Sequence, residues 1–244
     1  MTSSDNPFVP MFLISLGALV IISVPIVLGG SLPGDMRVLL AAMSIRNPAL
    51  TQIISILTFM GSAIPTIVLC AGLTLLEWRR TSRAPRSSPR SSPRSSPRSG
   101  VPRGISSTIG SMWRAAWPLI AYGGAMVTNI TMRLLIERLP PRVDSIQTLL
   151  PELQAGFQRF AYPSGHAVTV FVAYGAIAII ARRQSRLCIA ALLFAIIIIA
   201  GVGFGRLYLG VHWPSDVLAG YIVAIIWLIT ALGITRQSLR TKTA

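Results

Sequence analysis

The amino-acid sequence predicts an all-α, polytopic membrane protein with six transmembrane helices packed as a bundle. Three observations support this prediction. Of the 244 residues, 52% are hydrophobic and only 12% are charged, about half the charged fraction of an average soluble domain. The apolar residues occur in runs that are long enough to span a bilayer. The basic residues gather in short blocks between or after these runs, as in the loops of membrane proteins.

The first two predicted spans lie in the first third of the chain. One runs from Met11 to Leu28, after a short N-terminal segment, residues 1–10, which we expect to be cytoplasmic. The other runs from Leu50 to Leu76 and closes on a tryptophan and two arginines, which are typical of a membrane interface. A short segment with three charged residues, Ser31 to Pro48, connects them. We therefore expect two transmembrane helices within residues 11–80.

A basic, proline-rich segment separates the second and third spans. Residues 86–99 repeat Arg-Ser-Ser-Pro with a period of four. Proline at every fourth position is incompatible with a helix, and the repeat has no apolar side chain to bury. We predict a disordered cytoplasmic loop over residues 81–104. A solvated tether is the simplest interpretation, and a role in phosphorylation or at the lipid surface is the alternative.

Four further spans are predicted within residues 105–235. They are Trp113 to Ile136, Ser164 to Ala181, Leu187 to Phe204 and Ser215 to Ile234. A polar segment, Glu137 to Pro163, follows the third span, and a short connection, Gly205 to Pro214, precedes the sixth. Residues 236–244 form a basic tail, which we expect to be cytoplasmic.

The distribution of positive charge predicts the orientation. Fifteen of the 22 basic residues lie after the second span, after the fourth span and in the tail. If every run crosses the bilayer, these three segments share one face, which the positive-inside rule assigns to the cytoplasm. The polar segment and the short connection then lie on the outer face. The net charge of +15 is thus explained by membrane topology, and we expect no nucleic-acid partner.

The sequence gives no indication of a metal or cofactor site. The two cysteines, Cys70 and Cys188, lie in apolar segments and show no metal-ligand spacing. We therefore expect no metal centre and no cofactor, and an activity that survives chelation.

The two histidines of the chain both lie at span ends on the predicted outer face. His212 comes just before a helix start at Pro214, and Asp216 falls in the first turn of that helix. A carboxylate at this spacing can hold one imidazole nitrogen and leave the other as a nucleophile. Arg206 adds a forked cation suited to two phosphate oxygens.

The second histidine lies at the start of the fourth span. Ser164 is placed as an N-cap, and helix N-termini present free N–H groups to anions. Gly165 permits close approach of the backbone, and His166 is placed to give a proton to a leaving oxygen. Two histidines, an arginine and a helix N-terminus together favour phosphoryl transfer.

These two stretches resemble known family signatures. Pro163-Ser164-Gly165-His166 and Arg206-x5-His212-x3-Asp216 are similar to the second and third signatures of the type 2 phosphatidic acid phosphatase (PAP2) superfamily, including its bacterial membrane lipid phosphatases. The resemblance extends over roughly residues 10 to 235. It implies an active site at the outer membrane interface of a six-helix bundle.

The resemblance also implies a role for each motif residue. His212 would form a phosphohistidine, Asp216 would orient it, and His166 would be the general acid. The phosphate would be held by Arg206, Ser164 and the Gly165 N–H.

The first family signature, a basic residue, six residues and then Arg-Pro, is altered in this chain. Arg133 fits the leading basic position, but Pro140 stands where the arginine is expected. Either Arg138 or Arg142 could supply the missing cation. Arg138 is preferred because it is closer to the predicted end of the third span.

By resemblance, the expected activity is hydrolysis of a lipid phosphomonoester or diphosphate in a bacterial inner membrane, at a site facing the periplasm or exterior. Candidate substrates are undecaprenyl diphosphate, phosphatidylglycerol phosphate, phosphatidate and lipid A phosphate. A phosphotransferase that passes the phosphate to an acceptor lipid is the alternative. A non-enzymatic membrane protein with an altered first motif is a third possibility. The oligomeric state is left open.

Overall fold

The computed structural model describes residues 8–83, 110–141, 160–182 and 188–240, and every regular element within them is helical. The helices, in chain order, are α1 (Phe8–Val27), α2 (Asp35–Ser44), α3 (Pro48–Met60), α4 (Ala63–Arg83), α6 (Trp117–Ile136), α8 (Gly165–Ala181), α9 (Cys188–Tyr208) and α10 (Pro214–Arg240). The predicted all-α fold is thus confirmed for the described residues. The predicted disordered loop lies outside them, except for residues 81–83, which continue α4.

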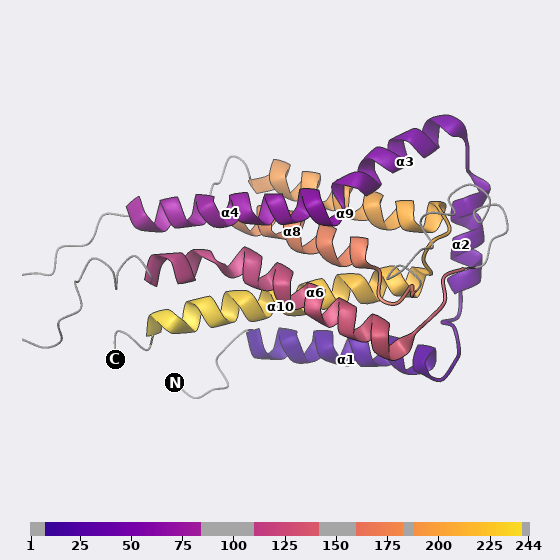
Figure 1. Cartoon of the computed structure of the whole chain (residues 1–244), viewed down its shortest axis with the longest axis horizontal. Helices are drawn as coiled ribbons and strands as arrows, with labels where there is room; N and C mark the ends of the chain where they lie inside the picture. Colours follow the sequence, from indigo (N-terminus) through magenta and orange to yellow (C-terminus); the bar gives the residue numbers. More distant parts are fainter. Residues whose placement is uncertain (1–7, 84–109, 142–159, 183–187, 241–244) are drawn as a thin grey trace, which may run out of the picture.

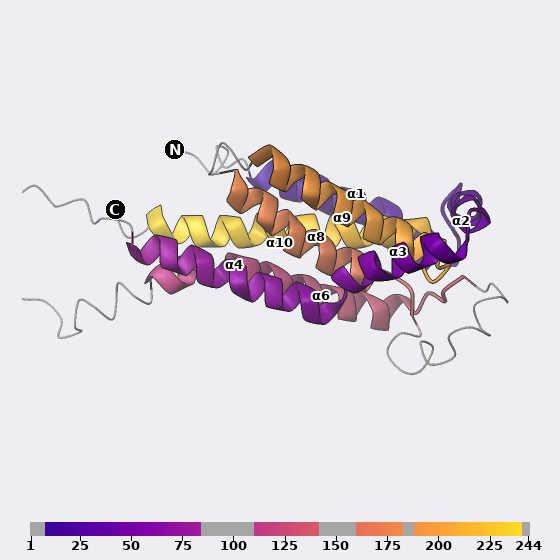
Figure 2. The same ribbon diagram turned by 90° about the horizontal axis from the view of Figure 1, so that it is seen from above.

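The long helices run along the length of the molecule, and α2 lies across one end (Figures 1 and 2). α8 is central, because it packs against α4, α6, α9 and α10. Nine of its 17 residues are buried, which explains why its sequence is apolar on all sides. α1 packs along α10.

Several helices can cross a membrane. α1, α6, α9 and the first 22 residues of α10 are each long and apolar enough, and the bent pair α3–α4 passes the same test as one broken span. Outward side chains such as Ile21, Ile64 and Leu135 are large, apolar and 72%, 75% and 77% exposed, as expected for a lipid-facing surface. The described chain is therefore an integral membrane protein with four to five candidate spans. The expected count of six is not reached, because α8 has only 17 residues.

The predicted span Leu50 to Leu76 is not one straight helix. It breaks after Met60 and bends by 46° between α3 and α4. In a continuous helix the Gly61 carbonyl would accept a hydrogen bond from residue 65, but Pro65 has no N–H. The Thr169 hydroxyl of α8 donates to the Gly61 carbonyl instead, at 2.6 Å. The break is thus stabilised by a neighbouring helix.

Two other segments differ from the prediction. The connection expected from Gly205 begins later, because α9 continues to Tyr208 and includes Arg206 in its last turn. The segment Ser31 to Pro48 contains the ten-residue helix α2, which begins after Gly34 at a φ of 94°. This positive φ favours glycine and lets the chain turn from α1 into α2.

The two ends of the bundle have different contents. The start of α1, the end of α4 and the end of α10 lie at one end (Figure 1). α2 and the connection between α9 and α10 lie at the other end.

Candidate functional site

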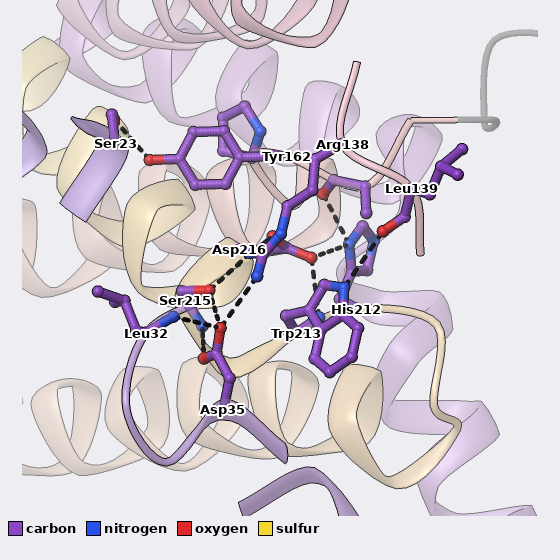
Figure 3. Close-up of polar contacts among 12 residues, drawn as sticks. Ser23, Leu32, Asp35, Arg138, Leu139, Tyr162, His212, Trp213, Ser215 and Asp216 are labelled. Carbon is purple, nitrogen blue, oxygen red and sulfur yellow. Dashed lines mark hydrogen bonds and ion pairs between the residues drawn. The ribbon is translucent and has the colours of Figure 1, made fainter. Parts of the chain in front are cut away.

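Polar side chains from separate parts of the chain meet at the end of the bundle that α2 covers (Figure 3). They come from the start of α2, the end of α6 with the residues just after it, the start of α8, the last turn of α9, and the start of α10 with the connection before it. The site residues expected from the sequence all lie in these segments.

His212 is buried, and its ring is held at one nitrogen. Nδ1 lies 2.9 Å from the Ala161 carbonyl oxygen and 3.6 Å from Asp216 Oδ2. Because a carbonyl oxygen can only accept, Nδ1 carries the proton and Nε2 carries the lone pair. The sequence placed Asp216 in this role, and the structure adds the Ala161 carbonyl as the shorter contact. No side-chain signal could have identified a backbone acceptor.

Asp216 is fully buried and accepts hydrogen bonds at both oxygens. Oδ2 accepts from the Trp213 backbone N–H at 2.8 Å, and Oδ1 accepts from Arg138 Nη1 at 2.6 Å. The first bond is half of a capping box, in which a carboxylate in the first turn bonds the N-cap N–H. The carboxylate that faces His212 is therefore fixed by its own helix start.

The start of α8 is fixed from two sides. The Ser164 N–H donates to the Asp216 carbonyl at 2.9 Å. The Pro163 carbonyl accepts from Asn129 Nδ2 at 3.0 Å and from Arg133 Nε at 3.2 Å, both on α6. A Cβ on Gly165 would lie 3.4 Å from Arg133 Nη2, so the glycine permits this close approach. Sequence reasoning missed Asn129, which lies one helical turn before Arg133.

Two buried polar atoms of the site have no partner among the described residues. They are Ser164 Oγ and Arg206 Nε. Buried polar atoms are almost always hydrogen-bonded, so two such atoms without partners, near the charges of Arg133 and Arg206, are suited to an anion with several acceptor oxygens.

The site carries an excess of positive charge. Burial, and then the charges of Arg206 and Arg133, hold the pKa of His212 well below its usual range. The bond to the Ala161 carbonyl acts in the opposite direction. His212 is therefore neutral near pH 7, the state that a nucleophile requires. His166 lies within electrostatic range of Arg206 and His212, so both imidazoles face the same cations.

Arg138 lies behind Asp216. Nη1 donates to Asp216 Oδ1 and to Ser215 Oγ, both at 2.6 Å, and Nη2 donates to Asp35 Oδ2 at 3.0 Å. Its guanidinium also lies over the Trp213 ring, 5.4 Å from the centroid. The sequence assigned Arg138 to the phosphate, whereas in the structure its donors contact carboxylates. The alternative, Arg142, lies outside the described residues.

Within the described parts of the chain, no group of three or more histidine, cysteine, aspartate or glutamate side chains could hold a metal ion.

Comparison with known proteins supplies independent findings. The sequence profile of the PAP2 superfamily matches residues 114–240, slightly more than half of the chain, and this region contains every predicted site residue. An undecaprenyl-diphosphatase from Sulfolobus acidocaldarius is 36% identical over 64 residues, and the match covers 26% of this chain and 28% of that protein. A phosphatidylglycerophosphatase B from Bacillus subtilis is 23% identical over 213 residues, 83% of each chain.

A solved structure shares the fold. The crystal structure of a transmembrane PAP2 type phosphatidylglycerolphosphate phosphatase from Bacillus subtilis matches with a TM-score of 0.62 at 22% identity. The match covers 94% of this chain and 96% of that chain.

Proposed function

The chain belongs to the PAP2 superfamily and is a phosphatase of that type, and from this premise we propose that it hydrolyses a lipid phosphomonoester or diphosphate through a phosphohistidine on His212. The observation that supports this most directly is a buried, neutral imidazole, held at Nδ1 and surrounded by arginines. The lone pair on Nε2 of such a ring can attack the phosphorus of an anion that the arginines bind.

The first half-reaction transfers the phosphoryl group to the protein. His212 Nε2 attacks phosphorus, and the bond between phosphorus and the lipid oxygen breaks. The leaving oxygen takes the bonding electron pair and a proton from His166, which becomes protonated once the negative charge of the bound phosphate offsets the neighbouring arginines. Asp216, 3.6 Å from Nδ1, stabilises the positive charge that develops on the ring of His212.

The second half-reaction releases phosphate. His166, now neutral, takes a proton from a water molecule, and the water oxygen attacks phosphorus. The bond between phosphorus and Nε2 breaks, which returns His212 to its neutral form. His166 is thus the general acid in the first half-reaction and the general base in the second.

In this proposal the phosphate is held by groups on α6, at the start of α8 and in the last turn of α9. Arg206 and Ser164 supply the orphaned donors, Arg133 supplies its Nη groups, and the Gly165 N–H opens α8. Phosphoryl transfer depends mainly on positioning and charge stabilisation, which such a set provides. Arg138 is not included, because its Nη groups contact Asp216, Ser215 and Asp35.

The substrate is proposed as a class. The similar proteins are an undecaprenyl-diphosphatase and a phosphatidylglycerophosphatase B. The panel to test therefore includes undecaprenyl diphosphate and phosphatidylglycerol phosphate, together with phosphatidate and lipid A phosphate. A phosphotransferase remains the alternative, and the fate of labelled phosphate separates the two. Label found as free phosphate supports hydrolysis, and label found on a second lipid supports transfer.

Phosphate release from this panel is expected to be unchanged when a chelator replaces divalent ions in the detergent buffer. The reason is that the proposed steps use only histidines, arginines and helix N–H groups. Release is measured with and without the chelator on the same purified protein. A strict requirement for a divalent ion would contradict this mechanism, and no release from any lipid phosphate would contradict the proposed function.

We also propose six membrane crossings, with the site end outside a bacterial inner membrane. The orientation rests on the ends of α4 and α10, which lie at the end of the bundle opposite to α2 and which basic segments follow in the sequence. In a variant with both native cysteines replaced by alanine, Ser31→Cys should react with a membrane-impermeant maleimide in intact cells. Ser82→Cys, exposed at the other end, should react only after lysis. The reverse pattern would show the opposite orientation.

A further inference from the structure

The helix α2 contacts both sides of the segment that carries His212. This segment, residues 209–213, connects α9 to α10 and is called the nucleophile loop below. α2 lies across the end of the bundle and packs against both α9 and α10 (Figure 1). No family signature noted in the sequence includes a residue of α2.

The first residue of α2 contacts the α10 side of the loop. Asp35 is only 4% exposed, and its Oδ1 accepts from the Ser215 N–H at 3.0 Å. Its Oδ2 accepts from Ser215 Oγ at 2.6 Å and from Arg138 Nη2 at 3.0 Å (Figure 3). A buried carboxylate is costly unless it is paired, so these contacts fix α2 and α10 relative to each other.

Arg138 links this carboxylate to the one that faces His212. Its Nη1 contacts Asp216 Oδ1 and its Nη2 contacts Asp35 Oδ2, so one planar guanidinium spans two buried carboxylates. A guanidinium held in this way has a fixed plane and fixes both partners. The position of Asp216 beside Nδ1 of His212 thus depends on a residue 181 positions earlier in the chain.

The turn that follows α2 and the first turn of α3 contact the α9 side of the loop. Arg46 Nε donates to the carbonyl of Tyr208, the last residue of α9, at 2.6 Å. The buried Tyr208 hydroxyl accepts from the Asn47 N–H at 3.0 Å and lies 2.8 Å from Thr51 Oγ1. The nucleophile loop is therefore anchored where it leaves α9 and where it enters α10.

We propose that α2 is a brace for the nucleophile loop, and that Asp35 and Arg138 are positioning residues that set Asp216 and thereby His212. This rests on the proposed function, because it assumes that His212 is the nucleophile. Neither side chain contacts the phosphate in this assignment. Arg138 acts through Asp216, which differs from the role that the sequence suggested for it.

The test compares Asp35→Asn with Arg37→Gln, an exposed arginine on the same helix. Asparagine keeps the size of the side chain and an acceptor for Ser215 but removes the charge that pairs with Arg138. The single-turnover rate on a short-chain phosphatidate, at saturating enzyme, should fall about 10- to 100-fold, because small misplacements of a nucleophile cost this much. KM and the inhibition constant of inorganic phosphate should change by less than about threefold. Arg37→Gln should match the wild type.

The choice of measurements separates positioning from simple loss of folded protein. A single-turnover rate at saturating enzyme is independent of an inactive fraction, so a purely structural defect would leave it unchanged. In a double-mutant cycle, Asp35→Asn with Arg138→Gln should lose no more rate than the worse single variant, since both act on Asp216. If Asp35→Asn cannot be purified, Ser215→Ala tests the same link, with an expected loss of about three- to tenfold.

Three outcomes would overturn the brace. The first is a wild-type single-turnover rate in Asp35→Asn, or in Ser215→Ala where that variant replaces it. The second is a parallel rise in KM and in the phosphate inhibition constant. The third is fully additive losses of rate in the double-mutant cycle. His212→Ala in the same assay shows whether the underlying function fails instead. If that variant retains activity, the proposed function is wrong. If it is inactive while Asp35→Asn is unaffected, only the brace is wrong.

Discussion

Replacing His212 by alanine is expected to lower phosphate release by about 10⁴-fold or more, which is the usual effect of removing a nucleophile from a site that acts as a unit. The imidazole is buried, neutral and held at Nδ1 by the Ala161 carbonyl, so alanine removes the Nε2 lone pair that the proposed mechanism uses. Release of phosphate from the best lipid of the panel is measured on purified, monodisperse protein in detergent.

The control for this variant lies beside it in the same loop. Val211→Ala removes a partly buried side chain of the loop without removing a group that the mechanism uses, so it should keep most of the activity. Near wild-type release by His212→Ala would refute the phosphohistidine assignment. A large loss in Val211→Ala as well would mean that the loop tolerates no change, and His212→Gln would then be the decisive variant.

Replacing Arg206 by lysine should lower kcat/KM by about 10²- to 10³-fold, even though the charge is kept. Arg206 lies in the last turn of α9, and its Nε is buried without a partner among the described residues. A guanidinium can bond two phosphate oxygens as a fork, whereas an ammonium offers a single point charge. The same variant should weaken inhibition by inorganic phosphate, because the lost donor contacts the phosphate itself.

An exposed arginine provides the control. Arg37→Lys, on α2 at the same end of the molecule, should leave both kcat/KM and phosphate inhibition unchanged. If Arg206→Lys behaved like Arg37→Lys, Arg206 would not be a phosphate ligand, and the clamp would have to be sought around Arg133. A loss in kcat/KM with unchanged phosphate inhibition would assign Arg206 to positioning instead.

The helices were predictable from the sequence where the length and apolar composition of a segment are sufficient to define a membrane span. α1, α6 and α10 begin and end within a few residues of the predicted spans, apart from the longer end of α10. The broken span was missed, because the break depends on a partner. Gly61 and Pro65 are visible in the sequence, but the Thr169 hydroxyl that satisfies the Gly61 carbonyl comes from a distant helix.

The candidate site was predictable in its reactive side chains and not in the groups around them. A histidine or an arginine in a spaced motif is visible because few residue types can do that chemistry. The Ala161 carbonyl could not be predicted because every residue has a carbonyl. Asn129 could not be predicted because its role depends on its hydrogen bond to the Pro163 carbonyl, which is distant in the sequence. Asp35 was visible as a charge but lies 180 residues from Ser215, its partner.

The sequence by itself therefore determined the membrane class, the family and the residue types available for chemistry, because hydrophobic run length and motif spacing are local properties of the chain. Only the tertiary structure decided which partner each buried charge has. Arg138 is the clearest case: its guanidinium could bind a phosphate or a carboxylate, and the fold brings Asp35 and Asp216 to it. The physical reason is that a buried charge pairs with the opposite charge that folding places within reach, and separation along the chain does not predict this.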